Sequence, residues 1–414
     1  MTDQDAPRAS TQVRHGKLPR SKPALGLLRL IGIAAIVALV SATSIVGVAV
    51  VSTISAIKPG VHLAHLKNEP VPQVGSISGA VNLLLAGSDS RTDQKYFQGP
   101  GELEGSSGAG NNDVTMVLHI SADHLHADVI SIPRDLLTAI PSCPRSNGTV
   151  AGPATMTMFN TTLSRGGLSC TVLTAEKLTG LTIDYAAEIS FDGVIAMSNA
   201  VGGVTVCLAT NINDPYVGLD LDAGEQTISG GTALAFLRSR HGVGDGSDLG
   251  RISDQQLFLS ALMRKIASAG VLSNPITMYN LANAAVQNMT LSDTLTSPTT
   301  MVAIALALKD IPLSNIVFVQ WPTASNAAYP GRVVAAEPAD SILASALDND
   351  QPLLLAGTLG RATVVAPSNL ATPSPTGTPT AAPTSASGGV ELPSDITGQT
   401  ANEQTCAVGF LQKG

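Results

Sequence analysis

The chain has 414 residues and a formal net charge of −8 at neutral pH. Two of its 31 acidic and six of its 23 basic residues lie within the first 29 positions, so the remainder is distinctly acidic. An acidic domain lacks the basic patch that nucleic-acid phosphates require, which excludes nucleic acid as a partner of the whole surface. One local phosphate site remains compatible with this charge, because a metal and a few arginines can outweigh it locally.

The amino-terminal part of the sequence predicts a membrane anchor. Residues 1–29 are polar and basic, and residues 30–57 follow without a single charge. A helix of that length crosses about 30 Å of hydrocarbon, and basic flanking residues stay on the cytoplasmic side. We therefore expect a cytoplasmic tail (1–29), one transmembrane helix (30–57) and an extracellular remainder of a single-pass cell-membrane protein. A cleaved signal peptide is the alternative.

The exported part is predicted to hold one large α/β domain. Residues 58–79 form a stalk, and residues 80–362 alternate between strand and helix patterns. Residues 363–390 are rich in Pro, Thr and Ser, which is typical of a linker. Residues 391–414 form a short C-terminal tail.

Three predicted strands carry acidic and basic side chains at their ends. VNLLLAGSDSR (81–91) is an aliphatic strand followed by a turn that holds Asp89 and Arg91. NNDVTMVLHI places Asp113 at the start of the next strand, and ADVISIPRDL places Arg134 and Asp135 at the end of a third. Each feature alone is typical of a polar turn or an exposed ion pair worth under ~1 kcal/mol. Together at one sheet edge they predict a site for a metal-bound phosphate ester.

Helix signals follow these strands. The pattern predicts a helix that ends at Gly180, a turn at Gly202 and Gly203 that leads into a strand, and a helix over residues 252–266 with apolar side chains at helical spacing. The apolar run 194–201 either lines a groove or belongs to the core.

A second basic cluster lies before the last of these helices. The apolar run 233–237 precedes Arg238 and Arg240, and a glycine-rich loop then leads to Arg251 and Gln255. If this segment is extended, side chains two residues apart face the same way. Arg238 and Arg240 could then bind one anion with two planar guanidinium groups. Two solvated side chains at the end of a strand are the alternative.

The four cysteines are expected to form disulfides, because an exported domain meets an oxidising environment. They are Cys143, Cys170, Cys207 and Cys406, and none forms a CxxC motif. Four cysteines allow three pairings. We favour Cys143 with Cys170, since the two flank one loop-and-helix excursion, but the sequence leaves the pairing open.

Over residues 80–266, and more weakly to about residue 355, the chain resembles the LytR–CpsA–Psr family of extracellular cell-wall polymer transferases. Any one motif is weak, but the ordered set is specific, and the membrane anchor and linker agree with it. The matching motifs are GSDSR at 87–91, NDVTM at 112–116, SIPRD at 131–135, RGG at 165–167, LTG at 178–180, GGV at 202–204, and RSR, DLGR and QQ within 238–256.

The resemblance implies a fold, a reaction and a set of site residues. The fold is an α/β domain with a mixed central sheet flanked by helices. The reaction attaches a glycopolymer from a polyprenyl-pyrophosphate carrier to a peptidoglycan hydroxyl. Asp89 and Asp113 would hold Mg²⁺, and both count as catalytic with Arg91 and Arg134. The pyrophosphate would be bound by Arg91, Arg134, Arg238, Arg240, Arg251 and Gln255.

Three positions depart from the family pattern, and each loses a cation. They are Asn111, Met158 and Asp254. The residues that bind the substrate are therefore less well defined than the class of reaction. Two other functions therefore stay open. One is hydrolysis of the same pyrophosphate carrier, and the other is a non-catalytic wall-binding or regulatory protein of the same fold.

Overall fold

The computed structural model describes residues 59–63, 79–92, 94–96, 110–268, 281, 284–367 and 388–410. The predicted cytoplasmic tail and transmembrane helix, most of the stalk and most of the linker lie outside these ranges. Within the ranges, no helix combines the length and the apolar character that a membrane span needs.

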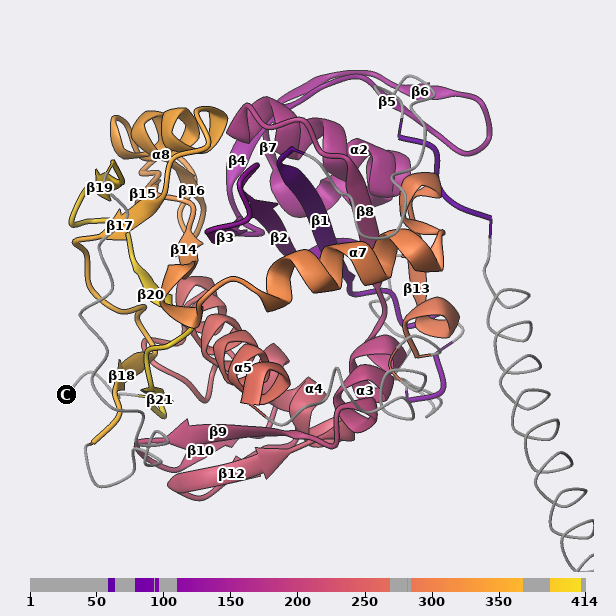
Figure 1. Cartoon of the computed structure of the whole chain (residues 1–414). Coiled ribbons are helices and arrows are strands. Elements are labelled where there is room, and N and C mark those ends of the chain that lie inside the picture. Colours follow the sequence, from indigo (N-terminus) through magenta and orange to yellow (C-terminus); the bar gives the residue numbers. More distant parts are fainter. Residues whose placement is uncertain are drawn as a thin grey trace, which may run out of the picture. The chain divides into compact units, whose positions relative to one another are not determined.

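A mixed seven-stranded β-sheet forms the centre of the domain (Figure 1). β1 pairs antiparallel with β2 and parallel with β8, and β3 pairs antiparallel with β2 and parallel with β14. The α/β fold with a mixed sheet is therefore confirmed. In spatial order the strands are β13 (Met289–Leu291), β8 (Tyr185–Ile189), β1 (Val81–Ser88), β2 (Asn112–Ile120), β3 (Ala127–Ser131), β14 (Ile316–Gln320) and β20 (Gly398–Thr400).

Helices cover both faces of this sheet. Helices α2 (Thr162–Thr179) and α8 (Ala339–Asp348) pack on one face, above the sheet in Figure 1. Helices α5 (Asp248–Ser268) and α7 (Pro298–Lys309) pack on the other face. Because strand side chains alternate between faces, Leu84 of β1 joins the first core and Leu83 the second.

A smaller four-stranded sheet packs against the far side of α5. It contains β12 (Gly224–Ile228), β9 (Val204–Leu208), β21 (Thr405–Ala407) and β18 (Thr363–Val365). Its core also includes residues of α4 (Gly230–Arg238), and α3 (Phe191–Ala200) packs against α4. Phe258 of α5 contacts this second core, while Leu259 contacts the core of the large sheet. Helix α5 is thus the layer that joins the two sheets.

The remaining strands form two-stranded ribbons at the periphery, with one short 3-10 helix among them that leads into α2. The ribbons are β4 (Leu137–Ile140) with β7 (Ala154–Met158), β5 (Cys143–Pro144) with β6 (Val150–Ala151), β10 (Ile212–Asp214) with β11 (Leu219–Leu221), β15 (Thr323–Ser325) with β16 (Val333–Ala335), and β17 (Leu353–Leu355) with β19 (Val390–Leu392); the 3-10 helix is η1 (Phe159–Thr161).

The C-terminal segment is part of the domain. The residues expected as a tail contribute β20 to the large sheet and β21 to the small one. In the small sheet Cys406 lies opposite Cys207 on β9, and the two form a disulfide. The second disulfide joins Cys143 to Cys170, which confirms the pairing that we favoured.

The RGG motif makes room for the disulfide between Cys143 and Cys170. A Cβ on Gly166 would lie 2.8 Å from the Cβ of Cys143 and 2.9 Å from that of Cys170, so only glycine fits beside the bond. Gly167 adopts φ +70°, which a residue with a side chain rarely adopts. Both glycines interrupt the regular geometry of α2, and the helix ends at Gly180, as predicted, with φ +80°.

We expect the disulfide between Cys207 and Cys406 to contribute more stability than the one between Cys143 and Cys170. The first closes a loop of 199 residues and the second one of 27, and a longer loop loses more chain entropy when it is closed. Replacing Cys207 and Cys406 together by Ser should lower the free energy of unfolding by about 2–5 kcal/mol. Denaturant unfolding of both double variants tests this, and a larger loss for the shorter loop contradicts it.

Candidate active site

Two carboxylates lie at neighbouring strand ends. Asp89 directly follows β1, and Asp113 is the second residue of β2, whose Asn112 lies opposite Ser88. Two hydrogen bonds join the backbone of Asn111 to Asp89. The Asn111 N–H donates to Asp89 Oδ1 (2.6 Å), and the Asn111 carbonyl accepts from the Asp89 N–H (2.9 Å). Burial raises the pKa of Asp89, and the negative charge of the nearby Asp113 raises it further.

Two arginines converge on Asp113. Arg134 Nη1 pairs with Asp113 Oδ1. Arg251, which reaches the site from the first turns of α5, donates from Nη2 to the Asp113 carbonyl (2.7 Å) and has Nη1 3.7 Å from Asp113 Oδ2. The same Nη2 lies 2.6 Å from Oδ1 of Asp248, one helical turn before it. Arg251 is only 6% exposed, so it fixes Asp113 from inside the domain.

Arg91 and Arg238 form the basic side of the cluster. The loop that carries Arg91 is anchored to α3, because the backbone N–H groups of Lys95 and Tyr96 donate to the Asp192 carboxylate (2.6 and 3.1 Å). Arg238 places its guanidinium 4.5 Å from the centre of the Phe191 ring, a cation–π contact. Burial and the nearby Arg91 both lower the pKa of Arg238. Two cations held this close favour an anion between them.

The predicted extended conformation before Arg238 is wrong, because residues 233–237 lie inside helix α4. A short apolar run fits a strand and a buried helix equally well, and here Ala233 and Phe236 pack on the α5 side as helical neighbours. Arg238 ends the helix. Arg240 follows in a loop. The Asp214 carboxylate fixes this loop, because it accepts hydrogen bonds from the N–H groups of Arg240 and Gly242 (3.0 and 3.1 Å).

Arg238 and Arg240 therefore do not share a strand face. Arg238 lines the cavity described below, whereas Arg240 is not among its lining residues. A role for Arg240 in anion binding stays a prediction.

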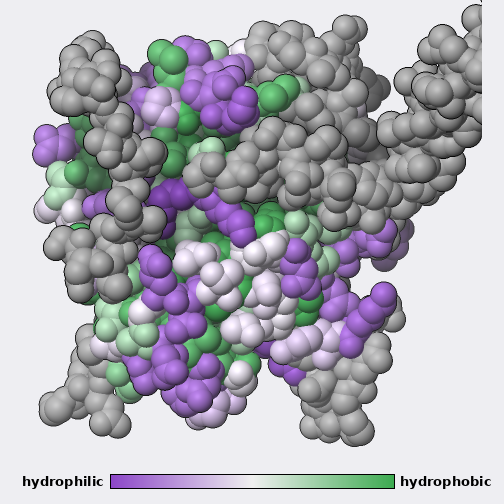
Figure 2. Space-filling model, turned by 60° about the horizontal axis from the view of Figure 1, so that its bottom comes forward, coloured by the Kyte–Doolittle hydropathy of each residue, from purple (hydrophilic) through white to green (hydrophobic). Residues whose placement is uncertain are grey.

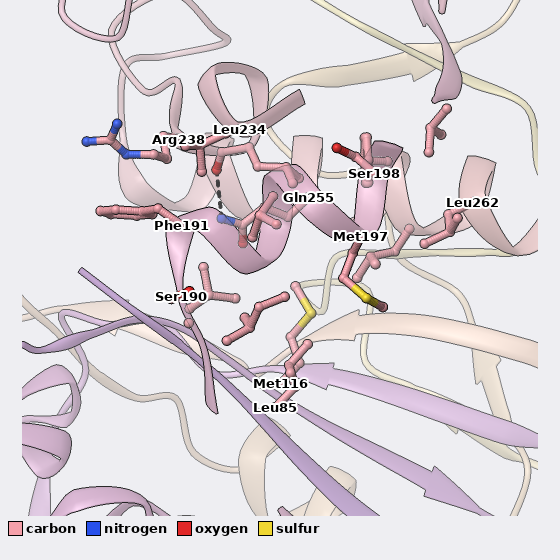
Figure 3. A pocket seen from close by; sticks show the side chains of 18 of the residues that line it. Leu85, Met116, Ser190, Phe191, Met197, Ser198, Leu234, Arg238, Gln255 and Leu262 are labelled. Atoms are coloured by element: carbon pink, nitrogen blue, oxygen red, sulfur yellow. Dashed lines mark hydrogen bonds between the residues drawn. The ribbon is translucent and has the colours of Figure 1, made fainter. Parts of the chain in front are cut away.

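A cavity of about 280 Å³ opens beside this cluster. Asp113, Arg238, Arg251 and Gln255 line its polar part, and Gln255 Nε2 ties α5 to α4 by donating to the Leu237 carbonyl (3.0 Å). Figure 3 shows Arg238 above the Phe191 ring at one end of the cavity and Met197 and Leu262 toward the other. The cavity thus joins a charged end to an apolar interior.

The apolar part of the cavity lies between the large sheet and helices α3, α4 and α5. Residues 194–201, which could have been plain core, contribute Val194, Met197 and Val201 to its lining. On the face shown in Figure 2, hydrophilic and hydrophobic residues alternate in small patches over the visible surface. An apolar lining between a sheet and three helices is of the kind that encloses a small or chain-like ligand.

The carboxylates of Asp89 and Asp113 are the residues of this site that could hold a metal. They offer only oxygen donors, which suits Mg²⁺. Burial together with mutual repulsion raises the pKa of Asp89, and a divalent cation would relieve both effects. The donor chemistry therefore fits the ion that the family resemblance implies.

Two neighbours of the cluster had no role in the sequence analysis. Asp248 pairs with Arg251, yet burial still raises its pKa. Arg332 pairs with Asp135 at 2.6 Å from a segment almost 200 residues away. Asp248 lies at the start of a helical pattern and one turn before Arg251, and this spacing could have indicated the ion pair from the sequence. Arg332 carries no local motif.

The three positions at which this chain lacks a cation of the family pattern have different surroundings. Asn111 holds Asp89, as described above, and Met158 ends the peripheral strand β7. Asp254 lies inside α5 with 0% exposure, and neither of its carboxylate oxygens has a hydrogen-bond partner in the part of the chain that the structure describes. Burial raises the pKa of Asp254 well above its usual range.

We expect Asp254 to make the protein less stable as pH rises. A carboxyl whose pKa is higher in the folded than in the unfolded chain stabilises the fold below its ordinary pKa, and this contribution is lost as pH rises toward the raised value. Asp254→Asn cannot ionise, so its melting temperature should exceed that of the wild type at neutral pH and approach it near pH 4. A wild-type advantage that grows with pH contradicts this assignment.

Fold and site together define an α/β protein in which a cluster of Asp and Arg side chains stands at the mouth of an apolar cavity. The LytR_cpsA_psr family model matches residues 50–344. The chain belongs to the LytR_cpsA_psr family.

Three curated relatives place the chain within this family. It is 30% identical over 267 residues to the cell wall biosynthesis protein LcpA of Corynebacterium glutamicum (60% of this chain, 51% of LcpA). It is 35% identical to the probable cell wall biosynthesis protein LcpB of the same organism (54% and 51%). Against the polyisoprenyl-teichoic acid–peptidoglycan teichoic acid transferase TagU of Bacillus cereus it is 29% identical (53% and 62%). The chain therefore spans about half the length of the two Corynebacterium relatives.

Among solved structures, the chain is similar to protein gbs0355 from Streptococcus agalactiae. The TM-score is 0.52 at 22% sequence identity, over 66% of this chain and 88% of the other. At this identity the likeness supports the fold.

Proposed function

We propose that this protein is an exported, membrane-anchored phosphotransferase. It attaches a glycopolymer from a polyprenyl-pyrophosphate carrier to a hydroxyl of peptidoglycan. The observation that carries the proposal is the cavity, because it joins an Asp and Arg cluster to an apolar interior. A polyprenyl pyrophosphate has the same two-part chemistry, a charged head on a hydrocarbon chain.

The proposed reaction breaks the pyrophosphate link. The acceptor oxygen bonds to the phosphorus that carries the glycopolymer, the bond to the bridging oxygen breaks, polyprenyl phosphate leaves, and the hydroxyl proton is released. Arg91 and Arg238 bind the phosphate oxygens on one side, and Arg134 balances the charge of Asp113 on the other. Mg²⁺ held by Asp89 and Asp113 would neutralise charge that develops on the phosphoryl oxygens.

Three residues act through their neighbours in this proposal. Arg251 keeps the Asp113 backbone and side chain in place, and Gln255 fixes the end of α4 that presents Arg238. Phe191 supports the Arg238 guanidinium from below. The hydrocarbon chain lies in the apolar part of the cavity, where burial of each CH₂ group contributes about 0.8 kcal/mol.

The membrane anchor belongs to the same proposal. A donor with a long hydrocarbon chain stays in the bilayer, so an enzyme that uses it gains from being tethered there. The uncharged segment 30–57 and the basic residues before it supply that anchor. Two disulfides in the described domain agree with an oxidising compartment outside the cytoplasm.

Product analysis with and without an acceptor tests the proposal. The full-length protein in detergent is given a short-chain polyprenyl-pyrophosphate sugar and a peptidoglycan fragment. The proposal predicts release of polyprenyl phosphate that depends on the acceptor, and an acceptor that carries the sugar phosphate. Equal release without the acceptor indicates a hydrolase instead. No release under either condition indicates a non-catalytic wall-binding or regulatory protein.

A further inference from the structure

A second group of chemically reactive side chains lies at the opposite end of the large sheet from Asp89 and Asp113. His119 is near the end of β2, and His126 immediately precedes β3. Asp350 follows α8 and has φ +51°, a conformation that non-glycine residues rarely adopt. One ligand atom from each of the three lies within 4.8 Å of the others.

The orientation of His119 is fixed by its neighbours. Asn82 Nδ2 donates to the Thr182 carbonyl (2.8 Å), so Asn82 Oδ1 must be the atom that faces His119 Nδ1 (2.7 Å). Oδ1 only accepts, and Nδ1 of His119 therefore carries the proton. In a neutral ring this leaves a lone pair on Nε2, which lies 3.0 Å from Asp350 Oδ1.

A cation, either a proton or a metal ion, would stabilise two acceptors that face each other at this distance. The other oxygen of Asp350 already accepts from the Ala122 N–H (3.0 Å). Oδ1 is thus directed at the imidazole nitrogen.

Two further buried groups lie near His119. His126 is 6% exposed, and its Nε2 has no hydrogen-bond partner among the residues that the structure describes. Asp128 is 0% exposed, and within the same described ranges both of its carboxylate oxygens lack a partner. Asp128 lies directly opposite His119 in the β2–β3 register and two residues after His126, so all three side chains project from the same face of the sheet.

We propose that His119, His126 and Asp350 bind one Zn²⁺ ion. Zinc takes imidazole nitrogen and carboxylate oxygen at about 2.0–2.2 Å in tetrahedral geometry, so two ligand atoms stand about 3.3–3.6 Å apart. Two neutral histidines and the Asp350 carboxylate leave the bound ion with a net positive charge, and the buried carboxylate of Asp128 lies opposite His119 on the same face of the sheet. The hydrogen bond from His119 Nδ1 to Asn82 is the outer contact that zinc-binding histidines usually make.

The ion would link two parts of the fold that no strand pairing joins. Strand β2 supplies His119, the turn before β3 supplies His126, and the segment between α8 and β17 supplies Asp350. Zinc here would fasten α8 to the sheet, far from the Asp and Arg cluster.

Metal content and thermal stability test the site. The full-length protein is purified with a tag that contains no histidine, exchanged with Zn²⁺ and dialysed. Wild type should retain about one Zn²⁺ per chain and melt at a lower temperature after chelation. His126→Gln and Asp350→Asn should lose the ion and the response to chelator. Asn82→Ala should weaken zinc affinity by roughly 10–100-fold.

Two controls make the result specific. His62→Gln removes another histidine that pairs with an aspartate, Asp293 at 2.8 Å on the surface, and should leave the zinc content unchanged. Asp113→Asn should also retain zinc, which separates this site from the catalytic carboxylates. Zinc-free wild type, or equal zinc content in wild type and both His126→Gln and Asp350→Asn, overturns the proposal and leaves a protonated His119 paired with Asp350.

Discussion

Replacing Asp89 or Asp113 by Ala is expected to abolish turnover while the fold stays intact. Both carboxylates stand at strand ends beside the polar part of the cavity, and their oxygen donors suit Mg²⁺. Losing a charge-stabilising group of this kind costs at least about 10²–10³-fold in kcat. For Asp113 the loss also leaves Arg134 and Arg251 without their shared carboxylate.

Stability and a matched aspartate serve as controls for these variants. Asp220→Ala changes an exposed aspartate of β11 that does not line the cavity, and should keep full activity. Melting temperatures within a few degrees of wild type would show that the fold survives. The metal assignment is wrong if either site variant retains turnover, or if wild-type turnover is indifferent to a chelator and to added Mg²⁺.

The second large effect is expected from Arg134→Lys and Arg238→Lys. Lysine keeps the charge but loses the planar guanidinium that binds two oxygens at once and stacks on an aromatic ring. Arg134 faces Asp113, and Arg238 lies 4.5 Å above Phe191. Losing such a contact in the transition state costs on the order of 2–4 kcal/mol, which is about 30- to 1,000-fold in turnover.

The matched control for these arginines is Arg361→Lys. Arg361 also pairs with an aspartate, Asp245 at 3.1 Å, but its side chain is 55% exposed, so the change should stay within about 0.5 kcal/mol in stability and be silent in activity. Arg240→Lys decides whether Arg240 shares the anion with Arg238. Wild-type turnover in both Arg134→Lys and Arg238→Lys would remove these residues from the site.

The strand ends of the site could be predicted from sequence because their signals are local. An aliphatic run followed by a polar turn marks Asp89, and an apolar run that starts or ends at a charge marks Asp113 and Arg134. The structure has strands at all three places. The helix that carries Arg251 was predictable for a similar reason, since its apolar residues keep helical spacing.

Other features depend on contacts between distant parts of the chain. The bond from Arg251 to the Asp113 carbonyl spans 138 residues, and no local pattern encodes it. Helix α4 was misjudged because five apolar residues fit either secondary structure. The cavity depends on the packing of three helices against the sheet, which only the fold reveals. Strand β21 is likewise set by its pairing with β9.

The central claim is that the cavity beside Asp113 and Arg238 holds the hydrocarbon chain of a polyprenyl phosphate or pyrophosphate. Mass spectrometry of lipid that copurifies with the full-length protein tests it most directly. Val194→Trp fills the cavity from α3, and Val150→Trp makes the same change at an exposed position of β6. The account predicts a polyprenyl phosphate lipid in the wild type and in Val150→Trp, and its loss in Val194→Trp. Absence of such a lipid from the wild type, or equal amounts in all three proteins, would contradict it.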